Sequence, residues 1–350
     1  MKRLVFRKEL VMAKSSIGII EVAKRCNTSI ASVSYAFSHR RPVSIKTRSK
    51  ILEVAKEMGY KPDMLASSFR RGKTDIIGLL IDTLNSPFFA YWANCLEQAA
   101  REKGHRVWLA NTEGDAELAK SYLAEFKSMR ICGVVVSTSA VCDNQIRELC
   151  ADGWTVVTRN RNVAGVSTSP VEIDFAAGIE QSVDYLFSLG HRKMGFIAGP
   201  VDDPTSMSRL AAFKRCTQQR GIMADESHIV YGKEGIGVGA DEAKRLLDNV
   251  HDLTAIISSC DTMAFAAMHA IASMGLQVPQ DISIVGYDDI PYAKLWHPSL
   301  TTVSTNIPEI ARIVIECVIS ENSQELCANK RVITPKLIVR ETCGKAKEKK

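Results

Sequence analysis

From residue 76 onward, short apolar segments alternate with longer amphipathic ones, and this alternation constrains the fold more than any other feature. Residues 76–81 form a continuous apolar run, which is typical of a parallel strand buried on both faces. A helix is expected to follow through residues 89–103. Further strands are predicted at residues 107–110, 133–136, 155–158, 171–174, 194–198, 229–231, 255–258 and 282–287, with helices between them. The repetition predicts an α/β architecture of doubly wound parallel sheets.

This α/β part is too long for one comfortable hydrophobic core, so two lobes are expected. Ligands of open α/β sheets bind beyond the carboxyl ends of the strands, so facing strand ends predict a cleft between the lobes. Aromatic rings that cover C–H faces and charged groups that bind hydroxyls suit a polyhydroxylated effector. The candidate effector-binding residues at these ends are Asn85, Phe88, Phe89, Asn160, Arg209, Asp261 and Asp288.

Each of these residues also has an ordinary structural interpretation. Asp and Asn at strand ends often cap the next helix, and Phe88 and Phe89 could belong to the core. Arg209 and Asp288 could simply pair with each other. The set, rather than any single member, indicates a ligand site.

Ahead of the α/β part, residues 19–38 have the pattern of two short helices joined by a tight turn. Asn27 suits the turn, and Ser29 is placed to cap the second helix. Val33, Ala36 and Phe37 form one apolar stripe. The opposite face could enter a DNA major groove and meet base edges. The candidate DNA-reading residues are Ser29, Ile30, Ala31, Ser32, Ser34 and Tyr35.

A third helix is predicted after Ser44, and it carries Lys46 and Arg48 as candidate phosphate contacts. Any small helical hairpin could share this pattern, and charge distribution favours the DNA-binding interpretation. Residues 1–74 hold 17 Lys and Arg against 5 Asp and Glu, whereas the remaining chain holds 28 against 34. A basic head on an acidic body is typical of a protein that binds a polyanion.

Residues 62–74 form a predicted hinge between the head and the body. Two turns of helix are marginal in water, so this segment is expected to fold only with a partner.

Several other classes of protein are disfavoured. The ten cysteines include no C-x-x-C pair, so neither a metal site nor a cofactor is predicted, and unpaired thiols favour a reducing cytoplasm. Neither a membrane-spanning run nor a secretion signal is expected. No motif assigns a catalytic nucleophile, so an enzyme is not predicted. Residues 1–16 are expected to be a disordered extension, and either Met1 or Met12 could be the start.

The chain resembles the lactose-repressor/galactose-repressor (LacI/GalR) family of bacterial transcription regulators from about residue 17 to residue 342. An ordered series of short motifs carries the resemblance. They are Glu21-Val22-Ala23, Ser32-Val33-Ser34, Val43-Ser44 with Thr47-Arg48, Met58-Gly59-Tyr60-Lys61-Pro62, Asn85-Ser86-Pro87-Phe88-Phe89, Leu189-Gly190-His191-Arg192, Val278-Pro279-Gln280-Asp281, Gly286-Tyr287-Asp288-Asp289 and Leu300-Thr301-Thr302-Val303.

The resemblance implies a homodimer that binds near-palindromic double-stranded operator DNA, with a hinge helix in the minor groove. Leu65 and Phe69 are the candidate DNA contacts of that hinge, and Phe69 is predicted to insert between base pairs. The resemblance also implies a periplasmic-binding-protein-like core that binds a small effector, commonly a sugar or nucleobase-type molecule. The implied division is a helix-turn-helix domain over residues 17–61, a hinge over 62–74, a core over 75–342 and a basic tail over 343–350. Lobe 1 would span about 75–174 and 306–331, and lobe 2 about 175–305 and 332–342. Departures from the family pattern at Tyr35, Ser67, Phe69, Asn160 and Phe175 leave the operator sequence and the effector open.

Two functions therefore compete. The first is an effector-responsive DNA-binding regulator, expected to be a repressor. The second is a cytoplasmic sugar-binding protein or sugar-acting enzyme whose helical head is an oligomerising appendage. Sequence-selective DNA binding separates them.

Overall fold

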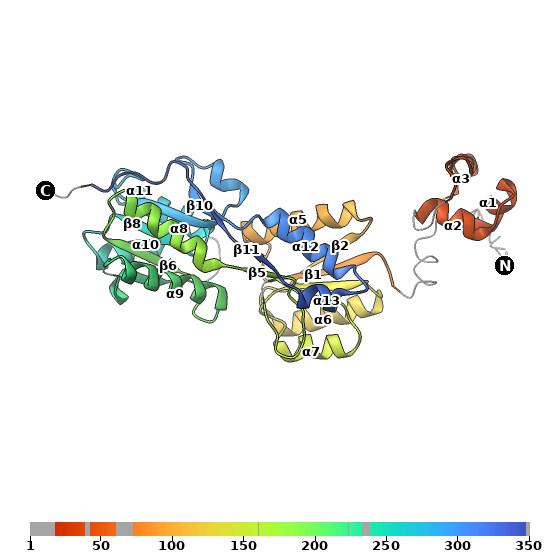
Figure 1. Cartoon of the computed structure of the whole chain (residues 1–350), viewed down its shortest axis with the longest axis horizontal. Coiled ribbons are helices and arrows are strands. Elements are labelled where there is room, and N and C mark those ends of the chain that lie inside the picture. Colours follow the sequence, from red (N-terminus) through yellow and green to blue (C-terminus); the bar gives the residue numbers. More distant parts are fainter. Residues whose placement is uncertain are drawn as a thin grey trace, which may run out of the picture. The chain divides into compact units, whose positions relative to one another are not determined.

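The computed structural model describes residues 18–38, 43–60, 73–159, 161–222, 224–232 and 239–347. The chain divides into two compact units, Met1–Thr74 and Asp75–Lys350 (Figure 1). The predicted N-terminal extension, the hinge residues Leu65 and Phe69, and Asn160 lie outside the described residues.

Three helices form the first unit: α1 (Ile19–Cys26), α2 (Ile30–Ser38) and α3 (Ile45–Glu57). Asn27 ends α1 in the left-handed conformation, at a φ of 51°, which lets the chain turn directly into α2. One small core joins the helices, and its fully buried members include Val22, Val33, Ala36 and Ile51. The arrangement is the helix-turn-helix that the apolar spacing predicts.

Lobe 1 of the second unit is built on a parallel sheet in the order β2-β1-β3-β4. The strands are β1 (Ile76–Ile81), β2 (Arg106–Asn111), β3 (Gly133–Ser137) and β4 (Val156–Thr158). Alternate residues of β1 enter different cores, since Leu79 packs with α5 (Pro87–Glu102) and Leu80 with α6 (Ala116–Ser128). Helices on both faces explain why β1 is apolar throughout.

Lobe 2 is built on a six-stranded sheet in the order β12-β10-β9-β8-β6-β7. Only β12 (Lys336–Ile338) is antiparallel to its neighbour among these pairings. The other strands are β6 (Met194–Ala198), β7 (Ile229–Tyr231), β8 (Ala255–Ser258), β9 (Ser283–Asp288) and β10 (Thr301–Ser304). Helices α8 (Phe175–Ser188) and α9 (Pro204–Gln219) pack in one core, and α10 (Ala240–Asn249) and α11 (Asp261–Ser273) in another. The predicted doubly wound α/β architecture is therefore confirmed.

The chain passes between the two sheets more than once. β5 (Val171–Ile173) leads out of lobe 1, and it pairs in parallel with β11 (Arg331–Ile333), which leads back toward β12. Between them, β10 ends in lobe 2 and α12 (Ile307–Val318) packs against α5 in lobe 1. Both crossing strands are visible between the lobes in Figure 1.

The remaining described elements are α7 (Asp143–Ala151), α13 (Ser323–Ala328) and the short 3-10 helices η1 (Glu226–His228) and η2 (Pro291–Lys294). Among the described helices, none combines the length and the apolar character that crossing a membrane requires.

Candidate DNA-reading helix and effector site

Helix α2 presents the predicted reading face to solvent. Ser29 caps the helix, because its Oγ accepts a hydrogen bond from the Ser32 backbone N–H at 3.0 Å. Ile30 is 40% exposed, whereas Val33 on the opposite side is completely buried. Ala31 is also exposed, and Ser34 and Tyr35 are half-buried. The predicted reading residues thus lie on the side of α2 away from its buried stripe, and their contact with base edges stays a prediction.

The start of α3 places the two candidate phosphate contacts. Ser44 caps the helix by accepting a hydrogen bond from the Thr47 N–H at 3.2 Å. Lys46 is exposed in the first turn, and Arg48 is half-buried.

In lobe 2, Arg209 and Asp288 form a buried ion pair at the carboxyl end of β9. Each side chain is less than a tenth exposed, and Arg209 Nη2 lies 3.4 Å from Asp288 Oδ1. Arg209 Nη1 also donates to the Ser259 carbonyl at 2.5 Å. The guanidinium lies over the Tyr287 ring at 3.9 Å and the Phe175 ring at 4.6 Å. Arg209 and Asp288 thus pair with each other, which is the structural alternative left open above, and the aromatic rings fix the orientation of the guanidinium.

Burial controls the ionisation of Asp288. Loss of hydration raises its pKa to about 6, while the positive charges of Arg209 and Arg159 oppose that rise. The carboxyl group is therefore mostly ionised at neutral pH, and it gains its proton in mildly acidic solution.

Asp261, a predicted effector-binding residue, is held by contacts within lobe 2. Its side chain is completely buried. One carboxyl oxygen accepts the Ile290 N–H at 2.8 Å, and the other accepts the Thr302 hydroxyl. Burial, followed by the charge of Asp288, raises the pKa of this carboxyl well above its usual range. The structure thus gives Asp261 contacts that join α11 to the ends of β9 and β10.

In lobe 1, the predicted aromatics lie at the start of α5. The rings of Phe88 and Phe89 meet edge to face, with their centroids 5.4 Å apart. Phe89 is buried in the core, whereas Phe88 is only partly buried. Asn85 belongs to the exposed turn before the helix, where its backbone N–H donates to Thr83 Oγ1 at 3.1 Å.

The sequence analysis missed Arg159, which follows β4. Its guanidinium carbon lies 4.7 Å from the centroid of the Phe88 ring. Its positive charge also opposes the rise in the pKa of Asp288 in lobe 2. We call Phe88, Arg159, Phe175, Arg209, Tyr287 and Asp288 the interlobe cluster. The only sequence signal for Arg159 is a cation directly after a buried strand.

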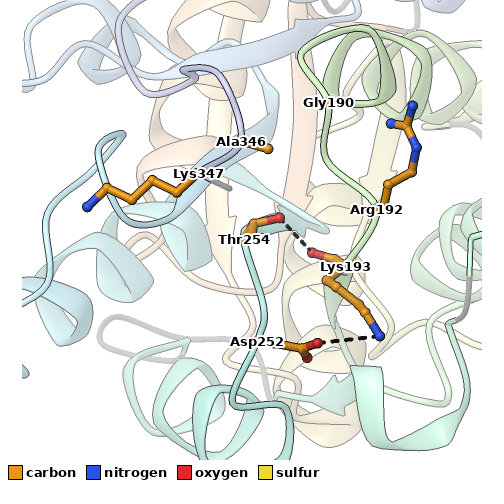
Figure 2. Close-up of a pocket in the computed structure, with 7 residues that line it drawn as sticks. All are labelled: Gly190, Arg192, Lys193, Asp252, Thr254, Ala346 and Lys347. Atoms are coloured by element: carbon orange, nitrogen blue, oxygen red, sulfur yellow. Dashed lines mark hydrogen bonds and ion pairs between the residues drawn. The ribbon is translucent and has the colours of Figure 1, made fainter. Parts of the chain in front are cut away.

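A separate shallow pocket lies at the amino ends of the lobe 2 strands, before β6 and β8 (Figure 2). Lys193 and Asp252 in its wall form an ion pair at 3.4 Å. Lys347 pairs with Asp281 at 2.5 Å. The pocket lies at the amino ends of the strands, and two of its cations, Lys193 and Lys347, are already paired with carboxylates. It is therefore not the candidate effector site. The described part of the chain contains no group of three or more His, Cys, Asp or Glu side chains that could hold a metal ion.

Two family models match the chain. Residues 18–63 match the bacterial regulatory proteins of the lacI family, and residues 183–343 match a periplasmic binding protein-like domain. The transcriptional regulator DegA of Bacillus subtilis is 28% identical over 326 residues, which cover 92% of this chain and 96% of DegA. The transcriptional repressor PurR of Klebsiella pneumoniae is 32% identical over 288 residues, which cover 81% of this chain and 84% of PurR.

Solved structures share the fold. The lac repressor dimer bound to operator and the anti-inducer ONPF superposes with a TM-score of 0.74 at 22% identity, covering 94% of this chain and 99% of that one. The transcriptional regulator CelR in complex with cellobiose gives a TM-score of 0.65 at 26% identity, covering 93% of this chain and 99% of that one. The extent of these matches, the helix-turn-helix and the two-lobed core lead to one conclusion: the chain belongs to the LacI family of bacterial transcriptional regulators.

Proposed function

We propose that this regulator is a cytoplasmic homodimeric repressor whose affinity for operator DNA changes when a small polyhydroxylated metabolite, such as a sugar, binds at the interlobe cluster. The observation that carries the proposal is the cluster itself. It combines a buried Arg209–Asp288 pair on aromatic rings with groups from the facing lobe. Binding there would contact both lobes, so the ligand could favour one relative arrangement of the lobes over another.

A mobility-shift experiment tests the proposal. The full chain is mixed with DNA from upstream of its own gene, with unrelated DNA as competitor, and candidate metabolites are added to the preformed complex. The proposal requires sequence-selective binding that at least one metabolite alters. A correctly folded dimer without selective binding would instead support the competing function, a sugar-binding protein or sugar-acting enzyme.

Tyr35→Ala is expected to change which operator half-site is preferred, at a cost of about 1–3 kcal/mol, because the half-buried Tyr35 belongs to the predicted reading face of α2. Lys46→Ala provides the contrast, since loss of a phosphate contact should weaken all sequences alike and reduce the salt dependence of binding. Selection of binding sites from random DNA, followed by affinity measurements at two salt concentrations, distinguishes the two effects. If Tyr35→Ala selects the same half-site as the wild type, the reading face is assigned incorrectly.

A further inference from the structure

Two cysteines of lobe 1 lie with their thiol groups next to each other. Cys317 belongs to the last turn of α12 and Cys327 to α13, ten positions further along the chain, and their Sγ atoms are 2.9 Å apart. Both are free cysteines, and both side chains are buried. A disulfide bond is about 2.05 Å long, so the two sulfur atoms need to approach each other by less than about 1 Å to form one.

The surroundings of Cys317 favour its thiolate, which is the form that reacts with oxidants. Cys327 Sγ at 2.9 Å and Ser323 Oγ at 3.4 Å can both donate hydrogen bonds to Cys317 Sγ. When it is protonated, Cys317 can itself donate to the Ser323 carbonyl at 3.5 Å. The hydrogen bond from Cys327 lowers the pKa of the Cys317 thiol, and burial opposes this effect. The same hydrogen bond, followed by burial, raises the pKa of Cys327. Cys317 is thus the thiol of the pair that ionises more readily.

Helix α13 gives an oxidant a route to the pair. The helix has six residues, of which Ser323 and Cys327 are buried, and its other side chains are exposed. A helix this short is marginal without its tertiary contacts, so α13 can open locally while the rest of lobe 1 stays folded. Opening uncovers Cys317 Sγ, because its polar neighbours Ser323 and Cys327 both belong to α13. Closing brings the two sulfur atoms back together.

We propose that Cys317 and Cys327 form a reversible disulfide when the protein meets a hydroperoxide, and that this bond fastens α13 to α12. The Cys317 thiolate attacks the peroxide and takes one oxygen atom to become a sulfenic acid, which releases an alcohol or water. The Cys327 thiol then attacks the sulfenic sulfur, so that the S–S bond forms and water leaves. The two thiols lose two electrons and two protons, which the peroxide gains, and a small dithiol reverses the reaction.

The disulfide acts on a segment that leads from one lobe to the other. Helix α13 ends at Ala328, and β11, which pairs with β5 where the chain passes between the lobes, begins at Arg331. Arg331 Nη2 also lies 3.8 Å from a carboxyl oxygen of Glu316, the residue before Cys317 on α12. Fastening α13 to α12 therefore constrains the chain directly before it enters the crossing strand.

Peptide mapping of the full chain tests the proposal. Trypsin releases residues 313–330 as one peptide that ends in its first Lys or Arg, and Cys317 and Cys327 are its only cysteines. Glu321 and Glu325 lie between these cysteines, so a second cleavage after glutamate gives fragments that only a disulfide holds together. The native protein is treated with hydrogen peroxide, and the remaining thiols are alkylated after denaturation. We expect joined fragments after peroxide, and separate alkylated fragments in untreated protein and after dithiothreitol.

Two variants and a matched control assign the roles of the thiols. In Cys327→Ser no second thiol can attack the oxidised Cys317, so its sulfenic acid should persist and react with dimedone. In Cys317→Ser, Cys327 should stay reduced at the peroxide concentration that oxidises the wild type. Cys95→Ser is the control, because Cys95 is buried in the same lobe and its thiol is hydrogen-bonded to Tyr91, and this variant should form the disulfide normally.

Hydrogen exchange tests whether the bond fastens α13. The amides of α13 should exchange at least about tenfold more slowly in the oxidised wild type than in the reduced protein, because exchange there requires local opening. Cys327→Ser should show no such change after peroxide. The proposal is overturned if peroxide leaves both thiols of residues 313–330 free to be alkylated, if either cysteine becomes linked to a different one, or if urea-unfolded protein forms the bond as fast. Unchanged exchange of α13 in the oxidised wild type would also overturn it.

Discussion

Arg209→Ala is expected to abolish the effect of the effector on operator binding while the protein still binds operator DNA. The substitution removes the donors that reach Ser259 and Asp288, and it leaves the Asp288 carboxylate buried without its nearest counter-charge. Breaking a buried pair by removing one partner costs about 3–5 kcal/mol of folding stability. Loss of the guanidinium donors that are proposed to bind the effector should separately lower effector affinity by at least about 100-fold. The measurement is the concentration of effector that changes operator binding by half, in wild type and variant.

Arg215→Ala is the matched control. Arg215 lies on the same helix, α9, but its side chain is exposed. The control should respond to effector as the wild type does. If Arg209→Ala retains the normal response, or if the control loses it as well, the effector site lies elsewhere.

The buried carboxyl group of Asp288 predicts that both folding stability and effector affinity depend on pH. The ordinary pKa of an Asp carboxyl is about 4, and burial raises that of Asp288 to about 6. Because the folded-state pKa is raised, the folded protein holds this proton over a range where the unfolded chain has released it. Burial of Asp288 therefore lowers the free energy of unfolding as the pH rises from about 4 to about 6, and this loss of stability is complete above that range.

Effector affinity should change in the opposite direction. The hydroxyl groups of the effector donate to the ionised carboxylate, so affinity should fall on acidification below about pH 6. Asp288→Asn should remove this part of the pH profile.

Sequence patterns identified the elements whose identity depends on local chemistry. The apolar run of β1, the Ser29 cap and the α2 stripe each agree with the structure. The pattern missed β10, β11 and β12, which are only three or four residues long. Such short segments become strands through their neighbours: β10 pairs with both β9 and β12, and β11 with β5. Strand formation there depends on contacts between segments distant in the sequence.

In the candidate effector site, too, sequence position predicted some residues, and others became evident only from the fold. Arg209 and Asp288 were predicted from their positions at strand ends, and the structure brings them together. Asp261 was predicted by the same reasoning, and its carboxyl group accepts hydrogen bonds from the Thr302 hydroxyl and the Ile290 N–H. Its role in effector binding stays a prediction. The sequence pattern did not identify Arg159, because its role depends on two residues that are distant in the sequence. The Phe88 ring belongs to another element of lobe 1, and Asp288 belongs to lobe 2. Sequence position identifies a strand end, whereas the direction of a side chain requires the fold.

Ile51→Asn is expected to unfold the helix-turn-helix and eliminate operator binding, while effector binding by the core continues. Ile51 is completely buried in a core of few residues that joins all three helices. Replacing it with Asn removes apolar contacts and buries an amide without arranged partners, at a cost of about 2–5 kcal/mol. A domain of this size has little stability to lose. The two-lobed effector-binding unit should stay folded, because residues 1–74 and 75–350 form separate compact units.

Ile45→Asn is the matched control, which tests whether an Asn anywhere in α3 has the same effect as an Asn in the buried core. Ile45 lies in the same helix but is 86% exposed, so the same substitution should leave the helices intact. Limited proteolysis measures folding of the head, and the thermal shift caused by effector measures folding of the core. Rapid cleavage confined to the head of Ile51→Asn, with a normal thermal shift, is the expected result. Loss of effector binding in Ile51→Asn would show instead that the core depends on the head for its stability.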